Sequence, residues 1–233
     1  MPQTITIQAY DGGSFNAYVA RPAGSGSHPA VVVIQEIFGI NDVMRGICDN
    51  LAKEGYVAIC PDLFWRQEPG IQLTDKTEAD WKRAFELFSG FNVDLGVEDL
   101  KSTLAAARTL EGTTGKAGTI GYCLGGKLAF LMATRSDADA NVSYYGVGLD
   151  ELLGEAGNIT KPILLHIAEK DKFVPPEAQK KIVDALLNKL GVTLHVYQGV
   201  DHAFARVGGE HYDAPMAETA NDRTRRHLKT HLS

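Results

Sequence analysis

The chain has 233 residues, of which 44% are hydrophobic, and a net charge of −6 at pH 7. This length suits one α/β domain or two small ones. At this size folding buries roughly 70–75% of the surface, so disulfides or metals are not needed for stability. The chain contains no basic block, which argues against binding to nucleic acid or to an anionic membrane surface. No run approaches 18 apolar residues, and the first residues lack the pattern of a signal peptide, so we expect neither a membrane span nor a secretory leader.

The three cysteines, Cys48, Cys60 and Cys123, form no C-x-x-C pair. An odd number without close spacing argues against a disulfide framework and indicates a reducing compartment. We therefore expect a cytoplasmic protein. Because the sequence shows no repeat and no linker, we expect a single domain over residues 1–233. We also expect a monomer.

The first predicted strands form an antiparallel hairpin. Residues 4–9 and 15–19 alternate between apolar and polar side chains, and a YDGG turn signal separates them. A loop rich in Pro, Gly and Ser then leads to an unbroken apolar run at residues 30–34. Such a run is typical of a parallel strand that is buried on both faces.

Strands and helices alternate in the rest of the chain. The further predicted strands are residues 56–60, 116–122, 142–146, 162–167 and 193–197. The predicted helices are residues 41–54, 78–89, 93–110, 124–135, 177–190 and 216–231, with at most one helical turn in the loop 147–160. This order predicts an eight-stranded, mostly parallel α/β sheet with an antiparallel N-terminal hairpin and helices on both faces. The excursion at residues 63–76 is too short for a separate domain, and ligands are expected beyond the carboxyl ends of the strands.

The segment KAGTIGYCLGG at residues 116–126 is an apolar run that ends in glycines and leads into an apolar helical pattern. It predicts a strand that turns sharply into a helix, with Cys123 at the tip and Gly121 and Gly125 on either side. Glycine suits these positions because a Cβ would clash in so tight a turn. The helix N-terminus favours the thiolate, which is the reactive form of cysteine. A buried structural cysteine in a Gly-rich turn is the alternative.

Two further polar side chains follow later strands. Asp171 comes after the seventh predicted strand and His202 after the eighth. Nucleophile, acid and histidine occur in this chain order in α/β-hydrolases, where the histidine takes the proton of the nucleophile and the acid orients the imidazole. We therefore predict Cys123, Asp171 and His202 as catalytic residues. Glu169 and Asp201 are rivals for the acid, and we expect Asp201 to face solvent.

Three histidines near the C-terminal edge, His195, His202 and His211, raise the question of a metal site. Their spacing contains no i, i+4 pair, and no carboxylate partner stands out. We expect no metal.

Glu36 follows a buried strand directly, where a carboxylate without a partner is costly. A role as a helix cap is disfavoured, because the next helix is expected to begin near residue 41. The loop after this strand is where a second oxyanion donor is expected, so we predict the backbone N–H groups of Ile37 and Leu124 as the pair. Glu36 would then border the thiol and hold Cys123 protonated until substrate arrives.

Five segments together resemble the dienelactone hydrolase (carboxymethylenebutenolidase) family. They are QEIFG at 35–39, CPDL at 60–63, GYCLGG at 121–126, YYG at 144–146 and HAFAR at 202–206. The resemblance covers essentially the whole chain. It implies an α/β-hydrolase fold without a large cap, a triad of Cys123, Asp171 and His202, and a Glu36 that modulates the thiol. It also implies cofactor-independent hydrolysis of an enol-lactone to maleylacetate in the breakdown of chloroaromatic compounds.

The same resemblance implies a substrate that carries a carboxylate. Arg206 is placed to bind it through its guanidinium, and a solvated surface arginine is the alternative. The other predicted substrate-binding residues are Tyr145, Phe38, Trp81 and Phe85. Members of the family carry an arginine and a tyrosine where this chain has Trp81 and Phe85, so we expect a more apolar pocket. Arg83 is a candidate for the missing arginine.

These observations predict a hydrolase that opens small enol-lactones through an acyl-enzyme on Cys123. Two alternatives remain open at this point. One is a carboxylesterase or thioesterase that uses the same triad on a more apolar substrate. The other is a non-catalytic binding protein on a hydrolase scaffold, against which the intact Cys, Asp and His argue.

Overall fold

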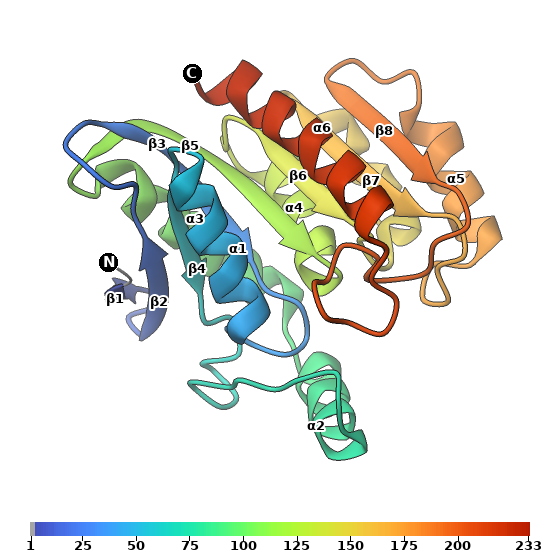
Figure 1. Cartoon of the computed structure of the whole chain (residues 1–233), viewed down its shortest axis with the longest axis horizontal. Helices are drawn as coiled ribbons and strands as arrows, with labels where there is room; N and C mark the ends of the chain where they lie inside the picture. The colour runs from blue at the N-terminus through green and yellow to red at the C-terminus, as the bar shows by residue number, and fades with distance from the viewer. Residues whose placement is uncertain (1–2) are drawn as a thin grey trace. The chain divides into compact units, whose positions relative to one another are not determined.

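A computed structural model describes residues 3–233 (Figure 1). The strands are β1 (Gln3–Gln8), β2 (Ser14–Ala20), β3 (His28–Ile34), β4 (Val57–Pro61), β5 (Thr113–Tyr122), β6 (Asn141–Tyr144), β7 (Ile163–Ala168) and β8 (Val192–Tyr197). The helices are α1 (Asp42–Lys53), α2 (Glu78–Ser89), α3 (Val93–Thr109), α4 (Leu124–Arg135), α5 (Pro176–Leu186) and α6 (Ala214–Leu232). Two short 3-10 helices, η1 (Leu149–Glu151) and η2 (Leu153–Asn158), follow β6.

The eight strands form one sheet in the order β1-β2-β4-β3-β5-β6-β7-β8. β2 pairs antiparallel with β1 and with β4, whereas β3 with β4, β6 with β7 and β7 with β8 are parallel. The predicted mostly parallel sheet with an antiparallel N-terminal hairpin is confirmed. No connection within residues 3–233 contains a separate cap domain.

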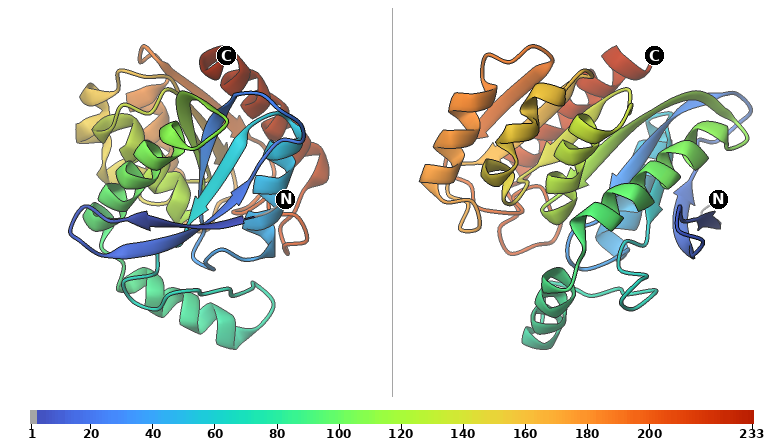
Figure 2. Two further views of the ribbon diagram at one scale, coloured as in Figure 1. Left: turned by 90° about the vertical axis from the view of Figure 1, so that its left-hand side faces the viewer. Right: turned by 180° about the vertical axis from the view of Figure 1, so that it is seen from behind.

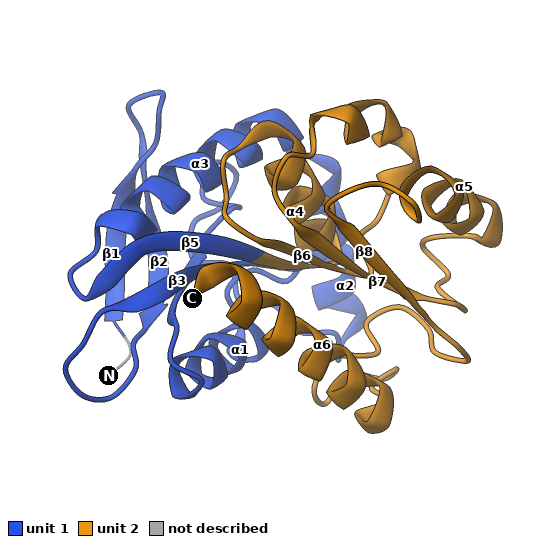
Figure 3. Cartoon of the chain, turned by 90° about the horizontal axis from the view of Figure 1, so that it is seen from above, with its two compact units in different colours: residues 1–119 blue, residues 120–233 orange. Residues whose placement is uncertain are grey.

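The chain divides into two compact units, Met1–Thr119 and Ile120–Ser233 (Figure 3). Within the first unit, α1 and α3 lie on opposite faces of the strands. This placement explains the unbroken apolar run of β3, in which Val31, Val32 and Val33 are fully buried. β5 crosses the boundary between the units, and a single domain over the whole chain stays a prediction.

Within the second unit, α4 and α5 cover one face of β6, β7 and β8, and α6 covers the other (Figure 3). Residues of β7, α4 and α5 form a hydrophobic cluster that includes Leu165, Phe130 and Ile182. The cluster packs against β7 and fixes its position in the sheet. Asp171 lies in the loop that follows this strand, three residues after its end.

Several element ends differ from the predictions. β6 ends at Tyr144 rather than at residue 146, because Tyr145 has a φ of 38° and leaves the extended conformation. α5 ends at Leu186 rather than at residue 190. Leu187 and Leu190 are 57% and 95% exposed, so no buried apolar face continues the helix there.

Buried carboxylates fix the excursion after β4, the segment at residues 63–76. The carboxylate of Asp62 accepts hydrogen bonds from the backbone N–H groups of Phe64 at 3.1 Å and Gly70 at 2.7 Å. Arg66 pairs with the buried Asp99 at 2.8 Å, which ties the excursion to α3. The excursion leads into α2, which stands apart from the strands of its own unit (Figure 2).

No helix among the described residues is long and apolar enough to cross a membrane.

Candidate active site

Cys123 stands alone between the end of β5 and the start of α4, with φ 57° and ψ −115°. A non-glycine residue rarely adopts such a conformation, and it persists only where the surroundings enforce it. A Cβ added to Gly121 would overlap the carbonyl group of Gly125, and one added to Gly126 would lie 2.6 Å from the Tyr144 oxygen. The glycines are therefore a steric requirement of the turn that presents Cys123.

The thiol of Cys123 lies at the start of α4 and is 7% exposed. Its backbone N–H donates to the Tyr144 carbonyl at 3.1 Å, which fixes the turn against the end of β6. Leu124 is the first residue of α4, where backbone N–H groups have no acceptor within the helix. Those amides and the helix dipole favour an anion at this point. The catalytic role of Cys123 stays a prediction that this environment favours.

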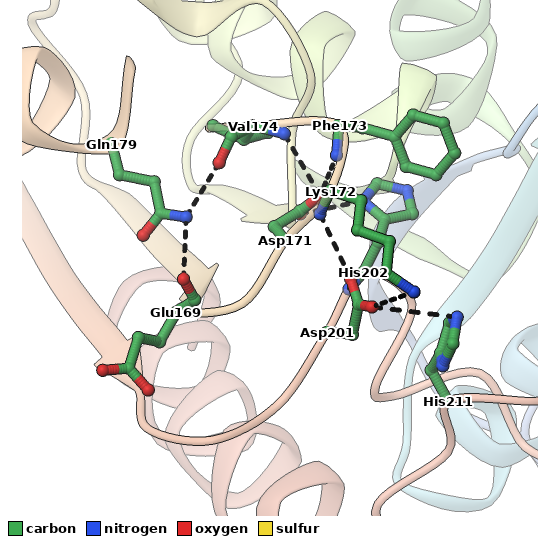
Figure 4. A network of polar contacts seen from close by, with 9 residues as sticks. All are labelled: Glu169, Asp171, Lys172, Phe173, Val174, Gln179, Asp201, His202 and His211. Atoms are coloured by element: carbon green, nitrogen blue, oxygen red, sulfur yellow. Dashed lines mark hydrogen bonds and ion pairs between the residues drawn. The ribbon is translucent and has the colours of Figure 1, made fainter. Parts of the chain in front are cut away.

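His202 and Asp171 form a buried pair. Nδ1 of His202 lies 2.8 Å from Oδ2 of Asp171, and both residues are 4% exposed. The other carboxylate oxygen of Asp171 accepts the backbone N–H groups of Phe173 at 2.8 Å and Val174 at 3.2 Å (Figure 4). These bonds fix the carboxylate, and the carboxylate fixes the orientation of the imidazole, so that Nε2 faces away from Asp171.

The charge state of His202 depends on Cys123. Burial by itself would lower the pKa of His202, but the charge of Cys123, followed by the hydrogen bond with Asp171, outweighs it and raises this pKa to about 10. A negative charge next to an imidazole favours its protonated form. The arrangement can therefore supply both a sulfur nucleophile and a proton donor near neutral pH.

The two rivals for the acid role have other partners. Oδ1 of Asp201 accepts the backbone N–H groups of His202 at 2.7 Å and Lys172 at 3.2 Å, and its Oδ2 pairs with Nζ of Lys172 at 3.0 Å (Figure 4). The expectation that Asp201 faces solvent is wrong, since its side chain is 16% exposed and joins the loop of Lys172 to the loop of His202. Glu169 accepts the backbone N–H of Gly199 at 2.7 Å. Neither carboxylate makes a polar contact with the imidazole of His202 in the described part of the chain.

Two aromatic rings border the imidazole of His202. The ring of Tyr145 lies 5.0 Å away and that of Phe173 lies 4.8 Å away, centroid to centroid. Phe173 was not predicted from the sequence, although it follows Asp171 by two residues and is 48% exposed. Within residues 3–233, the non-glycine residues with positive φ are Cys123, Tyr145 and Ala203. Backbone strain therefore gathers at the predicted catalytic positions.

The three histidines considered for a metal have different surroundings. His202 binds Asp171, the ring of His195 lies 6.5 Å from that of His166, and His211 lies 3.9 Å from Asp201. No group of three or more His, Cys, Asp or Glu in residues 3–233 is arranged to hold a metal.

Arg206, predicted to bind a carboxylate, is 7% exposed. The alternative of a solvated surface arginine is wrong. A guanidinium that is withdrawn from water needs anionic or hydrogen-bonding partners. Its role toward substrate stays a prediction.

The loop after β3 is fixed within the first unit. Gln35 accepts the backbone N–H of Leu63 at 3.0 Å, and Glu36 is 1% exposed. Asn41 caps α1 by accepting the backbone N–H of Met44 at 3.2 Å. Glu36 is therefore not the helix cap, and its position in a buried loop needs another explanation.

The predicted substrate residues of the first unit form a contiguous set. The rings of Phe38 and Trp81 meet edge to face at 5.0 Å, and those of Trp81 and Phe85 stack at 5.6 Å. Arg83 pairs with Glu68 at 2.5 Å and with Glu86 at 2.9 Å. Whether it replaces the missing arginine stays open.

A family model described as the dienelactone hydrolase family matches residues 15–232. The chain belongs to the dienelactone hydrolase family. The protein is therefore a hydrolase of the class that acts on ester or lactone bonds. The family resemblance seen in the sequence and the α/β-hydrolase fold are both confirmed.

Individual dienelactone hydrolase relatives match over nearly their full length. A carboxymethylenebutenolidase from Pseudomonas putida is 39% identical over 96% of this chain and 94% of its own. A protein from Azospirillum brasilense with a provisional name of the same kind is 56% identical over 98% of both chains. A Klebsiella pneumoniae structure, provisionally named a dienelactone hydrolase, superposes with a TM-score of 0.84 at 27% identity, covering 98% of this chain and 99% of the other. An esterase structure from Pyrococcus furiosus, at 17% identity, shares the fold with a TM-score of 0.74 over 100% and 93% of the two chains.

Proposed function

We propose that the protein hydrolyses a small enol-lactone of the dienelactone type to a maleylacetate-type product, with Cys123 as nucleophile and without a cofactor. The observation that carries the proposal is the buried Asp171–His202 pair, in which Cys123 raises the pKa of the imidazole to about 10. A charge-paired thiolate at a helix N-terminus is an activated nucleophile. The printed names of the Pseudomonas putida and other relatives support this choice of substrate.

The proposed reaction has two halves. The thiolate of Cys123 attacks the lactone carbonyl, and the backbone N–H groups of Ile37 and Leu124 stabilise the oxyanion. The ring oxygen leaves as an enolate and takes a proton from the His202 imidazolium, while Cys123 keeps the acyl group as a thioester. Neutral His202 then takes one proton from water, and the hydroxide attacks the thioester and expels the thiolate. The product leaves as a carboxylic acid, which loses its remaining proton to solvent.

Substrate selection in this proposal rests on Arg206 and Tyr145. A carboxylate on the substrate pairs with the guanidinium of Arg206, which is a suitable partner because it stays charged and can bind both oxygens. Tyr145 packs against His202 and shapes the pocket beside the reacting carbon. We further propose that the enzyme works as a monomer in the cytoplasm.

Turnover of cis- and trans-dienelactone tests the proposed function directly. We expect loss of the dienelactone absorbance with formation of maleylacetate, without added metal or cofactor. Mass spectrometry of the quenched enzyme is expected to show an acyl adduct on the peptide that contains Cys123. Rapid transfer of the acyl group to an added thiol, with little hydrolysis in water, would instead identify an acyl transferase. Unchanged lactone that stays tightly bound would identify a binding protein.

Glu36 is proposed to restrain the thiol until substrate arrives, because a carboxylate near Cys123 disfavours the thiolate. Replacing Glu36 by glutamine removes the charge and keeps the shape. We expect the variant to react faster with iodoacetamide than the wild type at neutral pH, with the difference fading as the pH rises. An alkylation rate that is unchanged across the whole pH range would exclude this role.

A further inference from the structure

We propose that His166 on β7 is a positioning residue for the nucleophile. As its neutral Nε2–H tautomer, it joins β8 to α6 by hydrogen bonds, and this connection fixes the turn at Tyr144 and Tyr145. The turn holds the backbone of Cys123 and packs against His202. The inference rests on the proposed function for the roles of Cys123 and His202, and it concerns the second unit alone.

His166 is buried between two hydroxyl groups from different elements, and it is 1% exposed. Its Nδ1 lies 2.8 Å from the hydroxyl of Tyr197 on β8, and its Nε2 lies 2.9 Å from the hydroxyl of Thr224 on α6. Burial, followed by the charges of His195 and Arg223, holds the pKa of His166 well below its usual value, so the ring is neutral near pH 7. A neutral imidazole has one N–H donor and one acceptor nitrogen, so the two hydroxyl groups play opposite roles.

The hydrogen bonds beyond Thr224 decide which nitrogen carries the proton. The hydroxyl of Tyr144 lies 2.9 Å from Oδ1 of Asn221 and 2.7 Å from Oγ1 of Thr224. An amide oxygen only accepts, so Tyr144 donates its single proton to Asn221 and accepts the proton of Thr224. Oγ1 of Thr224 therefore accepts from Nε2–H of His166, and Nδ1 accepts from the hydroxyl of Tyr197. Each of the four bonds then has one donor and one acceptor.

The network ends at the backbone of the turn that presents the nucleophile. Tyr144 and His166 are register partners in the parallel pair of β6 and β7, and their ring centroids lie 4.3 Å apart. The backbone N–H of Tyr145 donates to the His166 carbonyl at 2.8 Å. The Tyr144 carbonyl accepts the backbone N–H of Cys123 at 3.1 Å, and the ring of Tyr145 lies 5.0 Å from that of His202. A shift of this turn would therefore move the thiol and a neighbour of the imidazole together.

The turn needs a constraint from outside because its backbone is strained. Tyr145 has a φ of 38° and Cys123 a φ of 57°, and such values persist only where the surroundings enforce them. The packing leaves little space for error, since a Cβ on Gly126 would lie 2.6 Å from the Tyr144 oxygen. A buried network whose members are paired is rigid and directional, so it defines one position of Tyr144 more strictly than apolar packing does.

A pair of substitutions at Thr224, which lies outside the catalytic machinery, tests the inference. Thr224→Val keeps the shape and removes the hydroxyl, which breaks the network between His166 and Tyr144. Thr224→Ser keeps the hydroxyl and removes a methyl group. We expect Thr224→Val to lower kcat for phenyl acetate about five- to tenfold with KM within about twofold, because a misplaced nucleophile slows the reaction without weakening binding. Thr224→Ser is expected to stay within about twofold of the wild type in kcat.

A second readout does not depend on turnover. Alkylation of Cys123 by iodoacetamide, followed by mass spectrometry of the peptide that contains it, is expected to slow in Thr224→Val and to keep its rate in Thr224→Ser. The tautomer of His166 is read from the NMR chemical shifts of the labelled imidazole. We expect the neutral Nε2–H form in the wild type at pH 7.

Thr103→Val is the matched control for the loss of a buried hydroxyl. Thr103 is fully buried on α3, in the first unit, and its hydroxyl donates to the carbonyl of Asp99 at 2.8 Å. The substitution is expected to lower the melting temperature, as Thr224→Val does, because each leaves a hydrogen-bonding group without its partner. Only Thr224→Val is expected to change kcat and the alkylation of Cys123.

The outcomes separate this inference from the proposed function. The Nε2–H tautomer, with slower alkylation in Thr224→Val alone, supports the inference. A cationic or Nδ1–H imidazole, unchanged rates in Thr224→Val, or equal changes in Thr224→Ser or Thr103→Val would overturn it. If the wild type hydrolyses no ester or lactone, the proposed function fails, and the alkylation rates still decide whether His166 positions the thiol. If Thr224→Val fails to fold, Tyr197→Phe breaks the network at its other end and is judged by the same measurements.

Discussion

Replacing Cys123 by alanine is expected to lower lactone and aryl ester turnover by at least about 10⁴-fold, the scale on which loss of a nucleophile acts in triad hydrolases. The variant keeps the proposed oxyanion donors and the Asp171–His202 pair, so the loss of turnover reports on the sulfur atom of Cys123. Initial rates with dienelactone and phenyl acetate measure the effect. The strained backbone at position 123 accepts alanine as it accepts cysteine, because neither side chain is branched at Cβ.

The same substitution is also expected to change the titration of His202. In the wild type the charge of Cys123 contributes to a pKa of about 10, against an ordinary histidine value of about 6.5. A pKa raised in the folded state contributes stability that is fully present below about pH 6.5 and is lost as the pH rises through about 10. Without the charge of Cys123, the pKa of His202 is expected to fall, because the effect of burial is then opposed by Asp171 alone. NMR titration of the imidazole is expected to show this fall.

Cys48→Ala is the matched control for Cys123→Ala. Cys48 is a second fully buried thiol, and it lies on α1, outside the predicted site. Its loss is expected to leave turnover within about twofold of the wild type, because truncation in a core affects stability rather than chemistry. Full activity of Cys123→Ala, or an unchanged His202 titration, would contradict the thiolate–imidazolium mechanism.

Most of the fold was predictable because its signals are local. The apolar run of β3, the alternation of β1 and β2 and the glycines around Cys123 each reflect the geometry of a short segment. The chain order of the elements then predicted that Asp171 and His202 follow parallel strands at the same edge of the sheet. In the structure Nδ1 of His202 lies 2.8 Å from Oδ2 of Asp171. The end of β6 was missed because the positive φ of Tyr145 follows from its surroundings and not from its residue type.

The parts of the site that were missed depend on contacts between distant segments. Asp201 was expected to face solvent, yet it binds Lys172, 29 positions away. Arg83 pairs with Glu68, 15 positions away and outside its helix, and nothing in the sequence indicated this pair. Phe173 carries no motif, and only the folded loop turns its ring onto His202. Periodicity and spacing cannot report such pairings, since they describe one segment at a time.

Asp171→Asn is expected to lower kcat/KM by up to about 10⁴-fold, because an amide in place of the carboxylate orients the imidazole in the wrong tautomer. Two effects combine in this variant. The 2.8 Å bond from Nδ1 of His202 loses its charged acceptor, and the proton donor for the leaving group loses part of the stabilisation that keeps it charged. As the pH is raised, kcat/KM of the variant is therefore expected to begin its alkaline decline at a lower pH than that of the wild type.

Asp201→Asn is the matched control for Asp171→Asn, because it tests whether the loss of activity is specific to the carboxylate that contacts the imidazole. The two aspartates lie in the same network and the change is chemically identical, but Asp201 binds the backbone of His202 and Lys172 and not the ring (Figure 4). Oδ1 remains an acceptor in asparagine, so both backbone bonds can persist, and only the ion pair with Lys172 weakens. We expect a loss of turnover below about tenfold, in line with a partly exposed ion pair, and an unchanged pH profile. Equal losses in the two variants would assign the orienting acid to the network as a whole, whereas a larger loss in Asp201→Asn would remove Asp171 from the triad.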